Sequence, residues 1–226
     1  MTDGVEKGGI EPADTVAMRH AMVASQLRTT GVDDERVVTA MANLPREPFV
    51  PAASRNLAYR DTAIPLGGGR YLNTPMATAR LLTEAEILPD DRVLLIGAAT
   101  GYAAAILARL GARVTAVEEV PALAAAARDT LAGLDAVEVV EGPLAEGHAA
   151  GAPYDVLFVD GAVEQLPDTL LAQLRPTGRI ATGLIDNGVL RLATGRRTGT
   201  GAGIIPFADA ESVPLPGFAP PPVFRF

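Results

Sequence analysis

The stretch of residues 91–102 constrains the fold more than any other part of the chain. The run Val93–Ile96 is apolar without polar alternation, which indicates a parallel strand covered on both faces. Gly97 and Gly101 then bracket a loop of small residues that leads into an apolar helical pattern. Such a loop lets backbone N–H groups approach a ligand at the start of a helix. The sequence therefore predicts a ligand site at the edge of an α/β sheet.

A carboxylate marks the end of the next strand. The run Val114–Val117 is a second buried strand, and Glu118 follows at its carboxyl end, where an acid can accept both hydroxyls of a ribose. The dinucleotide motif G-x-G-x-x-G is not met, because Ala99 stands at the middle glycine and Tyr102 follows Gly101 directly. The spacing is nearer the G-x-G-x-G of methyltransferases that bind S-adenosylmethionine. A plain strand-to-helix turn explains the loop alone equally well, and Glu118 in register favours a cofactor site.

Composition excludes several classes of protein. The chain has 226 residues, of which 48% are hydrophobic, enough for one large domain. Its net charge of −8 argues against nucleic-acid partners and anionic membranes. The absence of cysteine excludes disulfides, thiolate catalysis and Cys-ligated zinc, and two histidines argue against a His-rich metal site, so we expect no metal. Without a signal-peptide pattern or a membrane-length apolar run, we expect a cytoplasmic protein, and we expect a monomer.

Strand and helix patterns alternate from Val93 onward, which predicts a parallel sheet with right-handed crossovers. The last connection, Gly195–Ala202, is too short for a helical crossover, so the final two strands should pair antiparallel. We therefore predict a doubly wound α/β fold of the class I methyltransferase type, with a seven-stranded, mostly parallel sheet and an antiparallel hairpin at its end. The predicted strands are Val93–Ile96, Arg113–Glu118, Val137–Val140, Asp155–Asp160, Arg179–Thr182, Val189–Ala193 and Gly203–Phe207, and the predicted helices are Tyr102–Leu110, Pro121–Leu131, Pro167–Leu174 and a short one near Leu144–Ala149.

A helical extension precedes this sheet. Asp14 is a candidate cap for a first helix, and Asp33 or Asp34 for a second. Residues 64–75 read as a long loop with three consecutive glycines, and residues 76–87 as a further helix. The segment 213–226 carries five prolines, which predicts an extended path along the surface.

Five further segments carry a family pattern. They are Met22–Arg28, the hexapeptide Arg46-Glu47-Pro48-Phe49-Val50-Pro51, Leu57–Asp61, Ala152–Val156 and Gln173–Arg179. Together they resemble the protein-L-isoaspartate O-methyltransferase family over residues 15–210. The N-terminal segments make this resemblance more specific than the glycine loop alone, since methyltransferases in general do not share them.

The resemblance implies a carboxyl O-methyltransferase that uses S-adenosyl-L-methionine, releases S-adenosyl-L-homocysteine and acts on isoaspartyl residues of damaged proteins or peptides. Composition and resemblance together divide one compact unit into a disordered tail (1–12), an N-terminal helical segment with the substrate loop (13–88), a Rossmann-like cofactor-binding domain (89–210) and a proline-rich tail (211–226). The implied site residues fall into three groups. Cofactor binding falls to Gly97, Ala98, Thr100, Gly101, Glu118, Leu144 and Asp160, substrate binding to Arg70, Tyr71 and Leu72, and catalysis to Asn73 and Thr74.

The chain departs from the family at the chemistry. Asn73 replaces the serine of the family's substrate loop, Ala99 replaces the middle glycine, and Pro143 replaces an aspartate near the adenine. Asn73 either positions the acceptor carboxylate through its amide or caps a turn or the following helix. Asp160 likewise faces the cofactor cleft or caps a turn. These departures leave two other functions open: a methyltransferase of this fold with a different acceptor, and a non-catalytic binding module.

Overall fold

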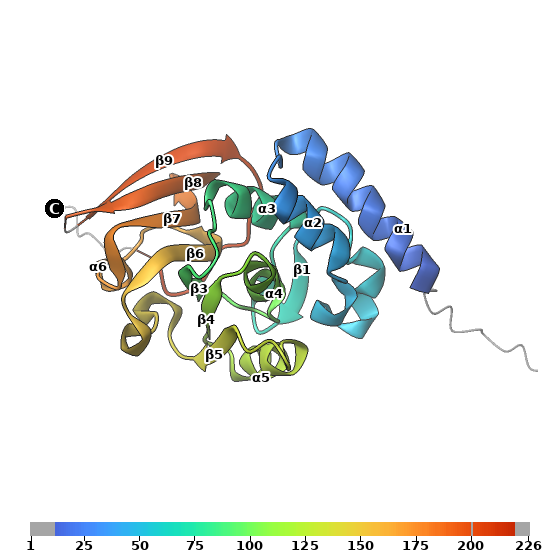
Figure 1. Cartoon of the computed structure of the whole chain (residues 1–226), viewed down its shortest axis with the longest axis horizontal. Helices are drawn as coiled ribbons and strands as arrows, with labels where there is room; N and C mark the ends of the chain where they lie inside the picture. The colour runs from blue at the N-terminus through green and yellow to red at the C-terminus, as the bar shows by residue number, and fades with distance from the viewer. Residues whose placement is uncertain (1–11, 200, 220–226) are drawn as a thin grey trace, which may run out of the picture.

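The structure, a computed structural model, describes residues 12–199 and 201–219. Its centre is a seven-stranded sheet with the strand order β5-β4-β3-β6-β7-β8-β9, which fans across the molecule in Figure 1. The strands are β3 (Arg92–Ile96), β4 (Arg113–Glu118), β5 (Val137–Glu141), β6 (Tyr154–Val163), β7 (Leu174–Asp186), β8 (Val189–Thr198) and β9 (Gly201–Asp209).

The pairing of these strands confirms the predicted fold class. β3 pairs in parallel with β4 and with β6, β4 with β5, and β6 with β7. β8 pairs antiparallel with both β7 and β9, so it is the reversed strand, and β9 runs parallel to β7 again. The short turn between β8 and β9 imposes this hairpin, as the sequence predicts.

Alternate residues of the central strands feed two separate hydrophobic clusters. Val93 and Leu95 of β3 point into the larger cluster, whereas Leu94 and Ile96 point into the smaller one. This is the period-2 geometry of a strand buried on both faces. The larger cluster is covered by the N-terminal helices and by helices between strands, and the smaller one by one short helix and the end of the chain.

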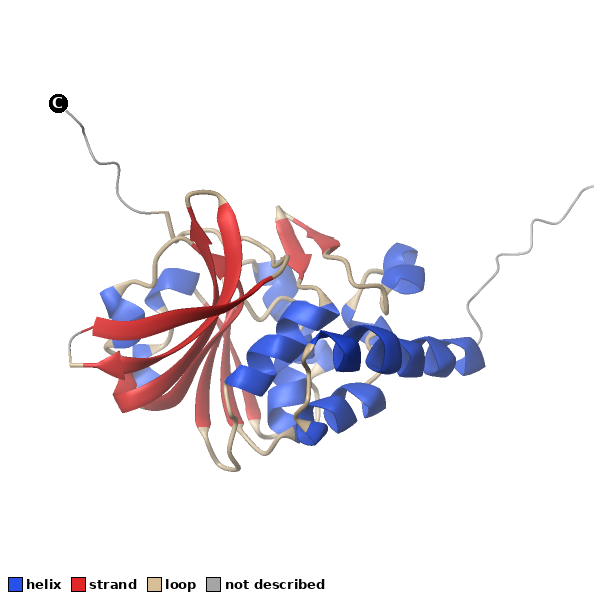
Figure 2. Cartoon of the chain, turned by 90° about the horizontal axis from the view of Figure 1, so that it is seen from above, coloured by secondary structure: helices blue, strands red, loops and turns tan. Residues whose placement is uncertain are grey.

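Most of the helices lie to one side of the sheet, as Figure 2 shows from above. The first helix begins at Pro12, a residue suited to the first helical position, so Asp14 lies inside the helix and the predicted Asp14 cap is wrong. The predicted cap at Asp34 is confirmed, because its carboxylate accepts the backbone N–H of Arg36. The helices are α1 (Pro12–Met22), α2 (Glu35–Asn43), α3 (Pro75–Glu84), α4 (Tyr102–Arg109), α5 (Pro121–Thr130) and α6 (Asp168–Leu171), with single helical turns at Val23–Leu27, Arg28–Thr30, Glu47–Phe49, Ala52–Leu57, Leu144–Glu146 and Ala149–Gly151.

The predicted loop at 64–75 contains a β-hairpin. β1 (Ile64–Gly67) pairs antiparallel with β2 (Arg70–Leu72) in a small sheet that stands apart from the main one in Figure 2. Gly67, Gly68 and Gly69 all adopt positive φ at the turn, a conformation that costs glycine little. The glycine run, interpreted as loop from the sequence, therefore builds a turn that returns the chain toward the sheet.

The sequence predicts an extended path along the surface for residues 213–226, of which 220–226 lie outside the described residues. The described part differs from this prediction, because it alternates buried with exposed side chains. Ser212, Val213, Leu215 and Phe218 are all buried, and the last three belong to the smaller hydrophobic cluster. The backbone here pairs with β6, because Ala162 N–H donates to Val213 O (2.7 Å) and Leu215 N–H donates to Ala162 O (2.8 Å). The alternating apolar residues between the prolines explain this burial, since an extended segment points alternate side chains to one face.

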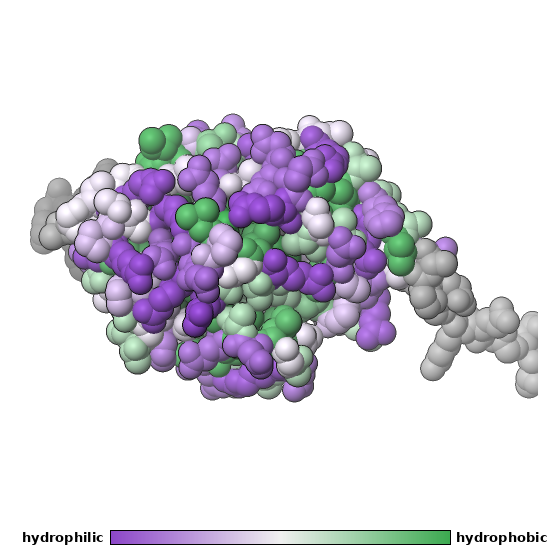
Figure 3. All heavy atoms as spheres, in the orientation of Figure 1, coloured by the Kyte–Doolittle hydropathy of each residue, from purple (hydrophilic) through white to green (hydrophobic). Residues whose placement is uncertain are grey.

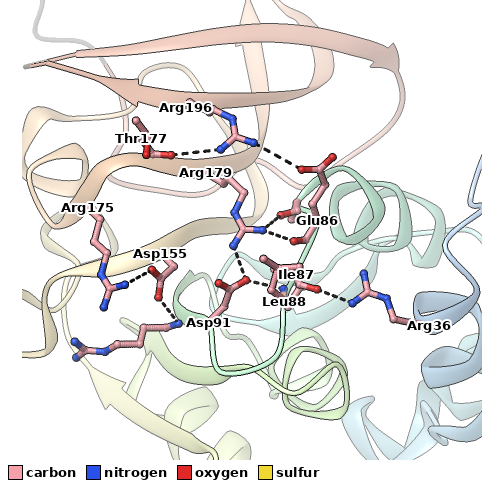
Figure 4. Close-up of polar contacts among 12 residues, drawn as sticks. Arg36, Glu86, Ile87, Leu88, Asp91, Asp155, Arg175, Thr177, Arg179 and Arg196 are labelled. Atoms are coloured by element: carbon pink, nitrogen blue, oxygen red, sulfur yellow. Dashed lines mark hydrogen bonds and ion pairs between the residues drawn. The ribbon is translucent and has the colours of Figure 1, made fainter.

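A charged network joins β7 and β8 to the segment that precedes β3. In Figure 4, Arg179 of β7 points between Asp91 and the backbone of Glu86, and its guanidinium lies 2.5 Å from the Asp91 carboxylate. Arg196 of β8 reaches the Glu86 carboxylate at 3.7 Å. The face drawn in Figure 3 is mostly hydrophilic, with apolar side chains in small separate patches. Among the described residues, no helix is long and apolar enough to span a membrane.

Candidate functional site

The candidate site lies where the order of the strands reverses. The chain passes from β3 outward to β4 on one side and later to β6 on the other, so their carboxyl ends border a crevice. In open α/β sheets this switch point is where ligands bind. The loop Gly97–Gly101 follows β3, Glu118 ends β4, and Asp160 lies near the end of β6.

The loop after β3 turns its backbone toward Glu118. Gly97, Ala99 and Gly101 have φ values of 80°, 50° and 98°, and Ala99 N–H donates to Glu118 Oε2 at 2.8 Å. A positive φ costs about 1–2 kcal/mol more for alanine than for glycine. Ala99 therefore has a strained backbone at the position where the resemblance implies a glycine. The Ala99 backbone therefore keeps the shape that the sequence motif requires.

Five N–H groups surround the carboxylate of Glu118, which is fully buried. Besides Ala99 N–H, the backbone N–H groups of Glu119 and Val120 donate to Oε1, both at 3.1 Å. Arg70 completes the set with Nη2 at 2.9 Å from Oε2 and Nε at 3.3 Å from Oε1. The side chains of this ion pair are 2% and 0% exposed. Arg70, predicted to bind substrate, thus lies buried against the predicted cofactor carboxylate.

Leu215 packs against the glycines of the crevice. A Cβ added to Gly97 would lie 3.0 Å from Leu215 Cδ1, and one added to Gly161 would lie 2.6 Å from Leu215 Cγ. Gly161 belongs to β6 and follows Asp160, so Leu215 bridges the ends of β3 and β6. The two glycines make room for this side chain, which comes from the end of the chain.

Asn73 joins three parts of the structure. Its Nδ2 donates to Asp160 Oδ1 (3.0 Å), and its Oδ1 accepts from Thr74 N–H (3.0 Å), Ser212 Oγ (3.2 Å) and Val213 N–H (3.3 Å). The substrate loop, the sheet and the end of the chain meet at this one buried amide. The helix cap considered for Asn73 falls instead to Thr74, whose Oγ1 accepts Ala77 N–H at the start of α3.

Asp160 is a buried acid with hydroxyl and amide donors. Thr78 Oγ1 donates to the same Oδ1 as Asn73, at 2.8 Å. Burial raises the pKa of the Asp160 carboxyl, while the hydrogen bonds from Asn73 and Thr78 and the charge of Arg46 work in the opposite direction. Arg46 lies beneath this cluster, with its guanidinium 4.4 Å from the Tyr102 ring centroid and Nη2 donating to Asn73 O. Burial in turn lowers the pKa of Arg46.

The remaining predicted residues occupy different surroundings. Thr100 turns its hydroxyl away from the crevice and donates to Phe49 O at 2.6 Å. Leu72 and Leu144 are buried in the hydrophobic clusters. Ala98 is buried in the loop, and its N–H donates to Val117 O. Tyr71 is 42% exposed at the outer face of the hairpin.

Sequence reasoning missed the roles of four residues in this region. Leu215 and Val213 carried a signal, because apolar residues alternate in the proline-rich segment. Arg46 belongs to the hexapeptide that carries the family pattern, but its contact with Asn73, like that of Thr78 with Asp160, joins segments distant in the chain and cannot be inferred from the sequence alone.

Two hollows lie at opposite ends of the strands of the sheet. One of about 450 Å³ lies beside the substrate loop, lined by Ala63, Thr74, Leu190, Asp209, Ala210, Glu211 and Ser212. The other, of about 660 Å³, lies at the amino ends of the strands and is lined by charged residues such as Arg92 and Arg113. Neither hollow is lined by Gly97–Gly101, Glu118 or Asp160, and the first one borders the predicted acceptor side of the site at Thr74.

Comparison with known proteins identifies the family. The sequence profile described as protein-L-isoaspartate(D-aspartate) O-methyltransferase (PCMT) matches residues 18–202. The chain belongs to this family. Protein-L-isoaspartate O-methyltransferase 1 of Rhodopseudomonas palustris (strain HaA2) is 38% identical over 205 residues, which cover 89% of this chain and 84% of that one. The protein-L-isoaspartate O-methyltransferase of Methanoculleus marisnigri is 42% identical over 164 residues, 72% of this chain and 74% of that one. The family and methyltransferase class implied by the sequence are confirmed.

Solved structures agree on the fold. A protein-L-isoaspartate O-methyltransferase matches with a TM-score of 0.76 at 24% identity and covers 88% of this chain, which spans 66% of that structure. A Plasmodium falciparum structure titled as a putative member of the family, in complex with S-adenosyl-L-homocysteine, matches with a TM-score of 0.74 at 16% identity. The alignment covers 89% of this chain and 97% of that one. At these identities the likeness concerns the fold of the family.

Proposed function

We propose that this family member transfers a methyl group from S-adenosyl-L-methionine to the free carboxylate of an isoaspartyl residue in a damaged protein or peptide. The observation that carries the proposal is the position of Glu118. It ends the strand next to the Gly97–Gly101 loop at the switch point of a family fold, with the Ala99 N–H directed at its carboxylate. A nucleoside with two adjacent hydroxyls is the ligand that such a carboxylate recognises.

The polar frame of the site fits this cofactor. Three of the five donors to Glu118 are backbone N–H groups, which fix the carboxylate without occupying the crevice. Gly97 and Gly161 expose backbone where any other residue would place a Cβ, and in the structure the Leu215 side chain lies against this backbone. Arg70 and Leu215 fill the space next to this frame in the structure.

The acceptor needs little chemical activation. An isoaspartyl carboxylate is ionised at pH 7, so no strong general base is required. When bound, S-adenosylmethionine supplies a methyl group activated by its sulfonium. The residues of the chain then have to hold the acceptor oxygen in line and exclude water.

Asn73 and Tyr71 suit the acceptor side. One N–H of the Asn73 amide is directed at Asp160, and its other N–H has no hydrogen-bond partner among the described residues, which leaves one donor for a carboxylate. Tyr71 is exposed on the same hairpin and can contact a peptide. The hollow of about 450 Å³ beside Thr74 is the approach for that peptide.

The test measures transfer of label from S-adenosylmethionine to an isoaspartyl peptide and to its aspartyl twin. We expect label in the isoaspartyl peptide alone, a large loss of transfer in Glu118→Gln, and retained or higher turnover in Asn73→Ser. If S-adenosylhomocysteine binds but only another acceptor is labelled, the isoaspartyl assignment is wrong. If no S-adenosylhomocysteine binds to the folded chain or to any variant of the site, the methyltransferase proposal fails.

For partners and location, we propose a cytoplasmic monomer that meets its protein or peptide substrate in solution and binds no nucleic acid. The net charge of −8 supports the last point, because nucleic-acid binding depends on cationic surface. Sedimentation equilibrium tests the oligomeric state, and a dimer at micromolar concentration would contradict it.

A further inference from the structure

Two segments from opposite ends of the fold converge on the crevice between β3 and β6. From the N-terminal side, the β1–β2 hairpin carries Arg70 onto Glu118. From the C-terminal side, residues 212–218, which we call the C-terminal strap, carry Leu215 onto Gly97 and Gly161. Gly97 lies within reach of both, because a Cβ there would be 3.0 Å from Leu215 Cδ1 and 3.5 Å from Arg70 Nη2.

The strap is held by a small number of specific contacts. Pro214 makes a parallel bridge with Ala162 of β6, in which Ala162 N–H donates to Val213 O (2.7 Å) and Leu215 N–H donates to Ala162 O (2.8 Å). Ser212 and Val213 also donate to Asn73 Oδ1. The strap lies outside residues 18–202, the part of the chain that matches the family profile.

The contacts of Arg70, Leu215 and Asn73 involve residues that the proposed function needs. Arg70 donates two hydrogen bonds to the carboxylate that would accept ribose hydroxyls. Leu215 lies over the glycine of the cofactor loop, and Asn73 Oδ1 is directed at the strap. A ligand that reaches Glu118 from the crevice must therefore exchange places with both side chains.

We propose that Arg70 and the C-terminal strap form an autoinhibitory closure of the cofactor crevice, and that cofactor binding requires both to move out. The inference rests on the proposed function, since it concerns the same crevice. The hairpin that carries Arg70 turns through three glycines at positive φ, and the backbone of the strap makes two hydrogen bonds to the sheet, both at Ala162. Both are elements that can leave without unfolding the sheet.

A closure of this kind lowers apparent affinity by a known relation. The measured dissociation constant equals the intrinsic one divided by the fraction of molecules that are open. Any substitution that weakens the closed form alone therefore tightens cofactor binding, up to the intrinsic affinity. Leu215→Ala removes the side chain that fills the crevice, and Arg70→Met removes the guanidinium while keeping a similar length.

The experiment titrates S-adenosylhomocysteine into the full chain by calorimetry, for the wild type and these two variants. We expect each variant to bind at least about tenfold more tightly than the wild type. Leu171→Ala is the matched control, because Leu171 is 6% exposed and Leu215 7%, and both belong to the same hydrophobic cluster. Its affinity should stay within about threefold of the wild type, since Leu171 lies on α6 rather than on the strap.

Hydrogen exchange on the unmodified chain provides a second readout that needs no variant to fold. S-adenosylhomocysteine should speed exchange at the amides of Ala162 and Leu215, the two that close the bridge. Binding by the variants where the wild type shows none would also support the closure. Equal affinity in all variants together with unchanged protection of the bridge would overturn the closure and leave the proposed function intact. No binding by the wild type or any variant would overturn both.

Discussion

Replacing Asn73 with alanine tests whether this buried amide holds loop, sheet and strap together. The substitution removes four hydrogen bonds of the side chain, with lengths of 3.0 to 3.3 Å. The bond to the Asp160 carboxylate involves a charged acceptor and contributes about 1.5–3 kcal/mol, whereas each long neutral bond contributes about 0.5 kcal/mol. The free energy of unfolding should therefore fall by about 3 kcal/mol, which for a chain of this length lowers Tm by about 6–12 °C.

Urea denaturation followed by circular dichroism at pH 7 measures this loss, with Asn43→Ala as the control. Asn43 is exposed at the end of α2 and donates only to Thr39 O, so its replacement should cost less than about 0.5 kcal/mol. Asn73→Asp extends the test, because it sets a second carboxylate against Asp160. Its penalty should shrink as the pH falls toward 4, where either acid can bind a proton. If Asn73→Ala costs no more than Asn43→Ala, the reasoning from the hydrogen bonds is refuted.

Three further substitutions test separate parts of the structure. Burial raises the pKa of Asp160, so the stability that its proton binding contributes is present below its unfolded pKa of about 3.9 and is lost as pH rises through the folded pKa. Asp160→Asn should therefore gain stability relative to the wild type as the pH of the urea titration rises. Stability curves that stay parallel across pH would contradict this. Gly101→Ala should destabilise by more than about 2 kcal/mol, because its Cβ would lie 2.8 Å from Leu131 Cδ1 at φ 98°, whereas Gly133→Ala, at φ 84° in open space, should cost only about 1 kcal/mol by thermal denaturation. Asp91→Ala should lower the free energy of unfolding by about 2–3 kcal/mol, because it leaves a mostly buried guanidinium of β7 unpaired, and a loss below 0.5 kcal/mol would indicate a solvated pair.

The strands of the sheet could be predicted because both faces of it are buried. β3 and β4 match the predicted ranges to within one residue, since continuous apolar runs have no other stable place. β7 begins five residues before its predicted start, because Arg175, Pro176 and Thr177 carry no strand pattern and join the sheet through pairing alone. The glycine run fits either a loop or a turn. The hairpin follows only from the pairing of Ile64 with Leu72 in the structure.

The site could be predicted in position and not in its connections. Gly97 and Glu118 follow from the strand pattern, because carboxyl ends of parallel strands meet at one edge. That Arg70 pairs with Glu118, and that Leu215 covers Gly97, depends on contacts between segments far apart in the sequence. Local patterns carry no information on such pairs. The positive φ of Ala99 could not be predicted for the same reason, because tertiary contacts hold the backbone at a φ that is unfavourable for alanine.

The position of the C-terminal strap sets an order of events during synthesis. Domains form as the chain emerges, from the N-terminus onward. Strands β3 to β7 are complete before residues 212–218 exist, so a nascent chain carries the glycine loop and Glu118 without Leu215 over them. At that stage Arg70 alone covers the crevice of the nascent chain, and Leu215 joins it only after residues 212–218 have been made. A cofactor molecule present then competes with one side chain of the same chain rather than with two.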